Sequence, residues 1–253
     1  ELIVESESNF DNHLDFTDVK GQQRAVRALE IAAAGGHNIL MIGPPGAGKT
    51  LLAKRIPSIL PPLSREECLD VTRIYSIANL LPKEHPVIND RPFRTPHHTA
   101  SAVSIIGGGR VPHLGEVSLA THGVLFLDEL PEYHRDVLES LRQPLEDGMV
   151  TVTRAAGAFT FPARFILAAS MNPCQCGYLG DSQHECICTP YQIQRYRSRI
   201  SGPIMDRIDL HVEVRRLELK DLKAEKKEES SKDIRNRVIK SRQSQQKRFL
   251  GTG

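Results

Sequence analysis

The sequence has 253 residues, 40% hydrophobic and 25% charged, with a formal net charge of +2. This length and composition suit one globular α/β domain, or one domain with part of another. No run of about 18 apolar residues occurs, which excludes a transmembrane helix, and the acidic start does not resemble a signal peptide. The chain does not begin with Met, so we interpret it as a fragment of a longer protein. The small net charge excludes no class of partner, because a basic groove can exist within a balanced total.

The first third of the chain alternates helical periodicity with a short apolar run. We interpret residues 1–15 as a linker. The pattern that follows predicts a helix over Val19–Ala34, a buried strand over Asn38–Ile42 and a second helix over Lys49–Leu60. Ser64 and Glu67 form a capping box, which predicts a further helix to about Leu80.

The stretch 82–112 is rich in Pro, His, Thr and Gly, and we interpret it as an insert. Buried strands are expected over Gly123–Asp128, Phe165–Ser170 and Leu210–Val214, with a hairpin over 149–162. A helix over His134–Glu146 is expected to end at Gly148. Alternating strands and helices predict an α/β fold with a five-stranded parallel sheet between helices, spanning residues 16–214.

Residues 43–50, GPPGAGKT, match the phosphate-binding pattern G-x-x-x-x-G-K-[ST] between a predicted strand and a predicted helix. Backbone N–H groups of such a loop surround phosphate oxygens, Lys49 reaches the terminal phosphates, and the Thr50 hydroxyl ligates Mg²⁺. The cofactors expected are therefore ATP and Mg²⁺. The predicted nucleotide-binding residues are Val19, Gly21, Gly43, Pro44, Pro45, Gly46, Ala47, Gly48, Lys49, Thr50 and Leu51.

Acidic residues end the most hydrophobic predicted strand. Asp128 is expected to hold Mg²⁺, and Glu129 to orient and deprotonate the attacking water. Asn172, just beyond the next strand, is a candidate to contact the γ-phosphate or that water, or else a turn residue before Pro173.

These motifs, with SGPIMDRID at 201–209, resemble an AAA+ ATPase. RTPHHTAS, GGGRVPHLGEVSLATHGVLFLDELPE, NPCQCGYLGD and SGPIMDRIDLHVEV resemble, more narrowly, the magnesium-chelatase-like clade and its bacterial ComM/YifB family. The resemblance covers about Phe16 to Val214.

The resemblance implies a homo-oligomeric, hexameric ring whose nucleotides lie at subunit boundaries. Arg207 occupies the position that resembles the arginine supplied by the neighbouring subunit, with Arg199 as the second candidate and an ordinary surface arginine as the alternative for either. It also implies a helical lid carrying another arginine and a Lon-protease-like domain ahead of the ATPase. We interpret 215–253 as the beginning of a truncated lid, and expect the fragment to bind nucleotide yet hydrolyse and assemble poorly.

Two segments resemble inserts of this clade: 82–112 resembles an insert in the second helix, and 149–162 the hairpin before the Asn-bearing strand. In related rings both point into the pore. Five basic side chains in them are candidates for contact with a DNA backbone, with solvated loop side chains as the alternative: Arg94, His97, His98, Arg110 and Arg154.

Four of the five cysteines lie within residues 172–190, which we call the Cys loop. Two C-x-C pairs joined by a turn can supply four thiolates to a structural Zn²⁺: Cys174, Cys176, Cys186 and Cys188. His184 is a possible substitute ligand, and disulfides or free thiols are the alternatives. The cluster indicates a reducing compartment, so the cytoplasm is the expected location.

Three functions are consistent with these motifs. The first is an ATP-driven DNA helicase or branch-migration factor acting on single-stranded or branched DNA, in recombination of incoming DNA during natural transformation. The second is a chelatase-type ATPase that remodels a protein partner during metal insertion. The third is a nucleotide-gated assembly switch without turnover, against which Lys49, Asp128, Glu129 and Asn172 together argue.

Overall fold

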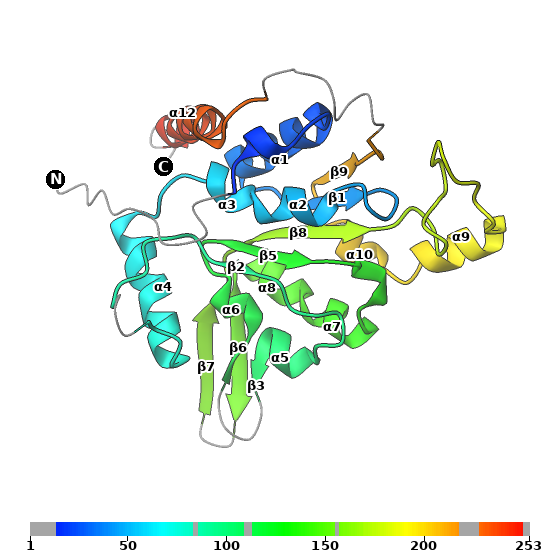
Figure 1. Cartoon of the computed structure of the whole chain (residues 1–253). Helices are drawn as coiled ribbons and strands as arrows, with labels where there is room; N and C mark the ends of the chain where they lie inside the picture. The colour runs from blue at the N-terminus through cyan, green and yellow to red at the C-terminus, as the bar shows by residue number, and fades with distance from the viewer. Residues whose placement is uncertain (1–13, 83–85, 109–112, 155–156, 218–227, 250–253) are drawn as a thin grey trace.

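A computed structural model of the chain describes residues 14–82, 86–108, 113–154, 157–217 and 228–249. Its centre is a five-stranded sheet in the order β2-β5-β8-β1-β9, in which every neighbouring pair is parallel (Figure 1). The strands are Phe93–Arg94 (β2), Val124–Leu127 (β5), Ile166–Met171 (β8), Ile39–Ile42 (β1) and Leu210–Glu213 (β9). The predicted α/β class and parallel sheet are confirmed.

The three central strands are buried on both sides, and their side chains alternate between two apolar cores. In β5, for example, Val124 and Phe126 join one core, while Leu125 and Leu127 join the other. Burial on both faces explains why these strands read as continuous apolar runs rather than as polar–apolar alternation.

One core is covered by Gln23–Gly35 (α1), Lys49–Lys54 (α2), Ile56–Ile59 (α3) and Ser231–Phe249 (α12). These helices form the layer above the sheet in Figure 1. The 3-10 turn Phe16–Asp18 (η1) precedes α1, and buried Phe16 joins the same core.

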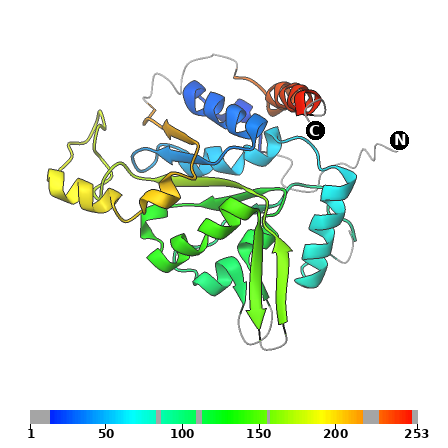
Figure 2. The same ribbon diagram turned by 180° about the vertical axis from the view of Figure 1, so that it is seen from behind.

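The other core is covered by Ala102–Ile106 (α5), Glu116–Leu119 (α6), Arg135–Ser140 (α7), Arg142–Asp147 (α8), Gly202–Met205 (α10) and the turn Leu130–Glu132 (η2). Arg65–Ile77 (α4) and Pro190–Arg197 (α9) lie at opposite ends of the molecule (Figure 2). The short pair Gly107–Gly108 (β3) and His113–Leu114 (β4) and the hairpin Met149–Arg154 (β6) with Gly157–Pro162 (β7) lie outside the central sheet. The hairpin extends away from it.

Two helices predicted as continuous are each divided in two, and both times a proline is the cause. The break between α2 and α3 lies at Arg55, and Pro57 has no N–H to donate to the carbonyl of Ala53. Pro144 likewise cannot donate to Ser140, and the break between α7 and α8 lies at Leu141. The predicted capping box at Ser64 and the helix end at Gly148, with φ 64°, are confirmed.

The predicted insert 82–112 is not wholly separate from the sheet. Its residues Phe93 and Arg94 form the edge strand β2, which pairs with Val124 and Leu125 of β5. Two residues are too few to give a periodic pattern, which explains why this fifth strand could not be located beforehand. The first helix also begins later than predicted, at Gln23, because Gly21 adopts φ 67° and interrupts it.

The segment interpreted as the beginning of a lid contributes α12, which packs on α1 and α3 of the sheet's helical layer. Its apolar positions Ile234 and Val238 are fully buried in the core shared with these helices. Across the described ranges, no helix combines the length and the apolar character required to cross a bilayer.

Candidate active site

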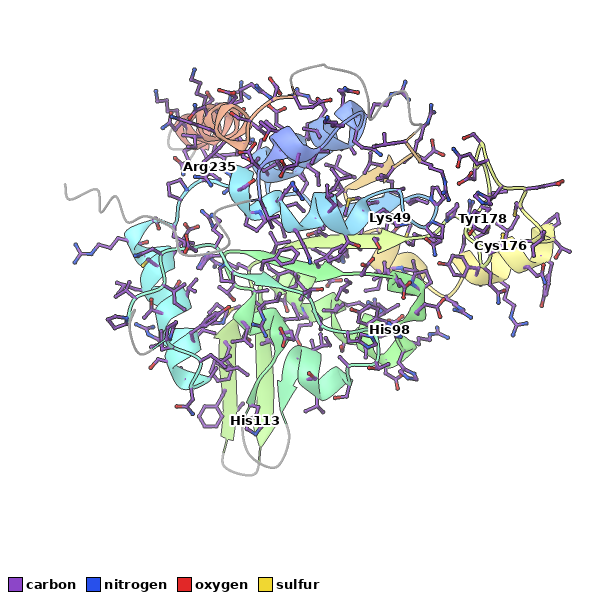
Figure 3. All side chains as sticks on the ribbon, viewed as in Figure 1. Lys49, His98, His113, Cys176, Tyr178 and Arg235 are labelled. Carbon is purple, nitrogen blue, oxygen red and sulfur yellow. The ribbon has the colours of Figure 1, made fainter. Side chains whose placement is uncertain are left out.

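Three polar segments follow the carboxyl ends of neighbouring parallel strands. The phosphate loop follows β1, Asp128 and Glu129 follow β5, and Asn172 follows β8. Since carboxyl ends of parallel strands share one edge, this topology brings the predicted catalytic residues together. Figure 3 shows Lys49 at this edge, between Cys176 and Tyr178 on one side and His98 below.

Lys49 is the first residue of α2 and is buried within its own loop. Its Nζ donates to the carbonyls of Gly43 (2.7 Å) and Pro44 (3.1 Å) and to Oδ1 of Asn172 (3.1 Å). Burial lowers the pKa of this amine, and the Asp128 and Glu129 carboxylates oppose that effect. The ammonium thus faces oxygen atoms that a phosphate oxygen can replace, as a phosphate-binding lysine requires.

Two glycines of the loop have specific structural reasons. Gly48 adopts φ 92°, a left-handed conformation that other residues rarely adopt, and it caps α2. A Cβ on Gly43 would lie 2.0 Å from the Val214 carbonyl oxygen, because the chain after β9 passes directly beside it. Gly48 therefore shapes the turn from the loop into α2, and Gly43 permits the close approach of β1 and the chain after β9.

Asp128 is held by hydroxyls from two elements. Oδ2 accepts a hydrogen bond from Thr50 Oγ1 (2.7 Å), and Oδ1 accepts one from Ser170 of β8. A carboxylate beside a threonine hydroxyl is the ligand pair expected for Mg²⁺ in a phosphate-loop site, so these residues fit that ion. Ser170, which is fully buried, was not among the predicted site residues, and its position directly before Met171 and Asn172 was the available signal.

Glu129 lies at the exposed side of the site in a left-handed conformation, with φ 54°. Its N–H contacts Asp128 Oδ1 (3.1 Å) and Ser170 Oγ (3.3 Å), which fixes the backbone while the carboxylate points outward. His98 Nδ1 lies 3.7 Å from Glu129 Oε2. A non-glycine residue in this region of φ is a strain that a functional site can retain.

Three further residues predicted to bind nucleotide have different environments: two lie ahead of α1 and one lies on α2. Val19 is buried in the core, and the Gly21 N–H donates to Glu228 Oε1 (3.2 Å). Leu51 is exposed on α2. Gln22, which was not predicted, donates through Nε2 to the carbonyls of Ala47 (3.2 Å) and Arg215 (2.7 Å), so it ties the phosphate loop to the chain after β9.

Arg207 lies at the other edge of the sheet, ahead of β9, where its carbonyl accepts from Asn38 Nδ2 (2.8 Å). Its guanidinium pairs with Glu146 of α8 and is partly exposed. The four residues of β9 separate it from the nucleotide edge by about 13 Å of strand. Arg199, the second candidate, pairs with Glu132 at 2.8 Å.

The proposed DNA contacts divide into different groups. Arg94 is not a free loop side chain: it forms a bidentate pair with Glu116, at 2.6 and 2.9 Å, because β2 carries it into the fold. The rings of His97 and His98 are in contact, tilted by 33° with 4.1 Å between centroids, and His98 faces Glu129. Arg154 ends β6 beside the hairpin turn, and Arg110 lies outside the described residues.

The four cysteine sulfurs of the Cys loop lie within 4.8 Å of one another. Sγ–Sγ distances of 3.4, 3.6 and 3.7 Å link Cys174, Cys176 and Cys186. A disulfide requires about 2.05 Å, whereas tetrahedral Zn²⁺ with ~2.3 Å Zn–S bonds separates its sulfurs by about 3.8 Å. All four cysteines are free thiols in this structure, and the donor set fits a thiolate-bound metal. His184 instead stacks on Tyr178 and lies 3.7 Å from Asp181.

The chain matches a known protein family over most of its length. A sequence model of the family "magnesium chelatase, subunit ChlI" matches residues 15–222, which covers the sheet, the phosphate loop, the acidic residues and Arg207. The chain belongs to this family. The predicted AAA+ fold class is thereby confirmed, and membership of the magnesium chelatase family supports ATPase activity for the site described above.

Several proteins of known sequence are similar to this family member. Competence protein ComM of Haemophilus influenzae is 47% identical over 98% of the chain and 49% of its own length. YifB of Escherichia coli is 47% identical over 92% of the chain and 46% of its own length. The magnesium-chelatase 38 kDa subunit of Cereibacter sphaeroides is 23% identical over 62% of the chain and 52% of its own length. The chain thus spans about half the length of these relatives.

Among solved structures, NtrX from Brucella abortus in complex with ADP is 18% identical to this magnesium chelatase family member, with a TM-score of 0.48. The match covers 76% of the chain and 35% of NtrX. NtrX in complex with ATP matches with the same TM-score and identity.

Proposed function

We propose that the chain is the ATP-hydrolysing part of a hexameric AAA+ motor that translocates on DNA, a helicase or branch-migration factor in recombination of incoming DNA. The observation that carries the ATPase part is the joining of Lys49, Asp128, Glu129 and Asn172 at one sheet edge. Thr50 and Asp128 would hold Mg²⁺, which would supply positive charge against the phosphates, and Glu129 would accept the proton of the attacking water.

Similarity to a competence protein over 98% of the chain supports the DNA part of the proposal. The β6–β7 hairpin supports it as well, since it extends from the sheet (Figure 1) and Arg154 is the last residue of β6. Contacts between such side chains and phosphates give affinity without sequence choice, which a translocating motor needs. Arg94 is paired with Glu116 and is not part of this candidate surface. His98 lies near Glu129, at the sheet edge that carries Lys49.

The ring is supported by the position of Arg207. It lies at the edge opposite Lys49 of the same chain, so its guanidinium serves a nucleotide only if a neighbouring subunit presents one. An arginine supplied in this way couples hydrolysis to assembly.

A structural Zn²⁺ bound by Cys174, Cys176, Cys186 and Cys188 completes the proposal. Backbone N–H donation, led by that of Tyr178, lowers the pKa of the Cys176 thiol to about 6, whereas the neighbouring sulfurs contribute to raising the pKa of Cys186 and of Cys188. Four neighbouring thiolates repel one another unless a cation lies between them. Such a cluster persists in a reducing compartment, for which we propose the cytoplasm.

The second candidate is a chelatase-type ATPase that remodels a protein partner during metal insertion. The 23% identity to a magnesium-chelatase subunit favours it, and it uses the same nucleotide site without DNA.

The test is the steady-state ATPase rate of the full-length protein with single-stranded, duplex and branched DNA, each compared with no DNA. Stimulation by DNA that disappears in Lys49→Ala supports the motor, and duplex unwinding is the next assay. ATPase activity indifferent to every DNA contradicts the motor and favours the chelatase-type role. A full-length protein that hydrolyses no ATP contradicts both.

A further inference from the structure

The Cys loop packs against the phosphate loop. Gly177 directly follows Cys176 and adopts φ 87°, and a Cβ added there would lie 2.8 Å from Cδ of Pro45. The backbone of the Cys loop is therefore in contact with the proline ring that forms the outer side of the phosphate loop. In Figure 3, Cys176 and Tyr178, which flank Gly177, are labelled to the right of Lys49.

A single guanidinium forms a second connection between the two loops. Arg216 donates through Nε to Asp181 of the Cys loop (2.9 Å) and through Nη2 to the carbonyl of Pro45 (3.3 Å). Asp181, whose side chain is fully buried, also accepts from the N–H groups of Gln183 (2.7 Å) and His184 (3.1 Å). One buried carboxylate and one arginine therefore connect the Cys loop to the Pro45 carbonyl.

The third connection is the chain itself. Cys174, a ligand candidate that is fully buried, lies two residues after Asn172, which accepts the hydrogen bond from Lys49. Arg197 of α9 donates to the carbonyl of Pro173 between them (3.3 Å). A single residue, Pro173, therefore separates Cys174 from the residue whose amide faces Lys49.

Between Asn172 and α9 the Cys loop has no helix or strand to fix its shape. Four metal–thiolate bonds would fix it at four points, and metal binding to such segments contributes directly to their folding. We propose that metal occupancy of the four-cysteine cluster controls nucleotide affinity and turnover, by holding Pro45 and Asn172 in the positions that bind phosphate. This inference rests on the metal and ATP sites proposed above, and adds that the first regulates the second.

The experiment measures zinc content and nucleotide affinity on the same samples of full-length protein, with a fluorescent ATP analogue as the probe. Zinc is removed with a thiol reagent and chelator, and Zn²⁺ alone is then added back. The expected result is one zinc per subunit, affinity weakened roughly five- to tenfold after removal, and recovery on re-addition. The double variant Cys186→Ser with Cys188→Ser should match the metal-free protein.

Two variants separate regulation from loss of folding, because both keep all four thiols. Arg216→Met removes the guanidinium bridge, and Gly177→Ala places a methyl group against Pro45. Each should retain zinc while weakening nucleotide binding. Cys68→Ser is the control: this cysteine lies outside the cluster, and its Sγ contacts the Ile88 carbonyl at 3.1 Å, which a serine hydroxyl can also do. It should retain both zinc and nucleotide affinity.

Each outcome has a distinct meaning. Protein that takes up no zinc overturns this inference and leaves the ATPase proposal standing. Zinc that can be removed without changing affinity or turnover also overturns it, as does normal affinity in both Arg216→Met and Gly177→Ala. Zinc-loaded wild-type protein that binds no nucleotide overturns the ATPase proposal itself.

Discussion

At the scale of single residues, Ser170 organises the acidic side of the site. Its hydroxyl donates to Asp128, and the same oxygen accepts from the Glu129 N–H at 3.3 Å. One buried hydroxyl thereby orients both the carboxylate that we propose binds Mg²⁺ and the backbone of the glutamate that we propose as the base. Groups that orient metal ligands commonly contribute tenfold or more to metal affinity or activity.

Ser170→Ala is expected to raise the Mg²⁺ concentration needed for half-maximal ATPase activity about tenfold, because Asp128 loses one of its two hydroxyl partners. A Mg²⁺ titration of the ATPase rate measures this. Ser118→Ala is the matched control, since Ser118 is equally buried but its Oγ has no hydrogen-bond partner among the described residues. Identical Mg²⁺ curves for the two variants would contradict the role given to Ser170.

Glu129→Gln is expected to leave ATP binding intact and to slow hydrolysis by about 10²-fold or more, because the amide cannot accept the proton of the attacking water. Equilibrium binding and single-turnover hydrolysis, measured on the same preparation, separate the two effects. Turnover at the wild-type rate would show that another group acts as the base.

At the scale of elements, α12 is held on α1 by a charged group as well as by its apolar side chains. Arg237 donates to both oxygens of Glu30, at 2.7 and 3.2 Å. Glu30 is largely buried, while Arg237 is partly exposed, so solvent weakens the pair. The Arg237 hydrogen bonds, and then those of Arg27, lower the pKa of Glu30 below its ordinary value of 4.5.

Glu30→Gln is therefore expected to cost about 1 kcal/mol of unfolding free energy at neutral pH. The folded-state pKa of Glu30 is below its unfolded value, so this contribution is complete above about pH 4.5 and disappears as the pH falls through the folded-state pKa. Thermal unfolding of both proteins at several pH values checks the sign. Glu213→Gln, which affects an exposed 3.9 Å pair with Arg215, should change nothing.

The elements also show which parts of the fold the sequence could predict. The phosphate loop, the capping box and the helix end at Gly148 were predictable because each depends on a few consecutive residues. The strand at Phe93–Arg94 and the Arg94–Glu116 pair were not, since both depend on packing against residues distant in the chain. Ser170 meets Asp128 only because β5 and β8 pair in one register, with Leu127 opposite Ala169, and one sequence does not state that register.

At the scale of the whole molecule, the nucleotide edge and Arg207 lie at opposite ends of the parallel strands. We expect the Arg207→Ala variant to bind ATP normally and to lose hydrolysis. Each of its nucleotide sites would then lack the guanidinium that we propose the neighbouring subunit supplies. Mixing Arg207→Ala with Lys49→Ala protein should restore part of the activity. In such a mixture the second variant offers an intact Arg207 to the intact phosphate loop of the first.

The mixing experiment is read as ATPase rate against the ratio of the two variants. A rate that stays at the sum of the separate proteins at every ratio would contradict a shared site. Glu146→Gln serves as a further comparison, because it releases Arg207 from its partner within the chain without altering the phosphate loop. It should increase, rather than abolish, the activity of the assembled protein.

The β6–β7 hairpin has a mechanical consequence. Each strand has six residues, so the arm reaches about 20 Å from its base. At that base, Ala163 bonds to Gly148 and His122 bonds to Arg164, and only three residues separate Pro162 from the fully buried strand β8. A close-packed strand of this kind transmits displacement with little compression. We therefore expect a displacement of the hairpin strands to be passed along β8 toward Ser170 and Asn172.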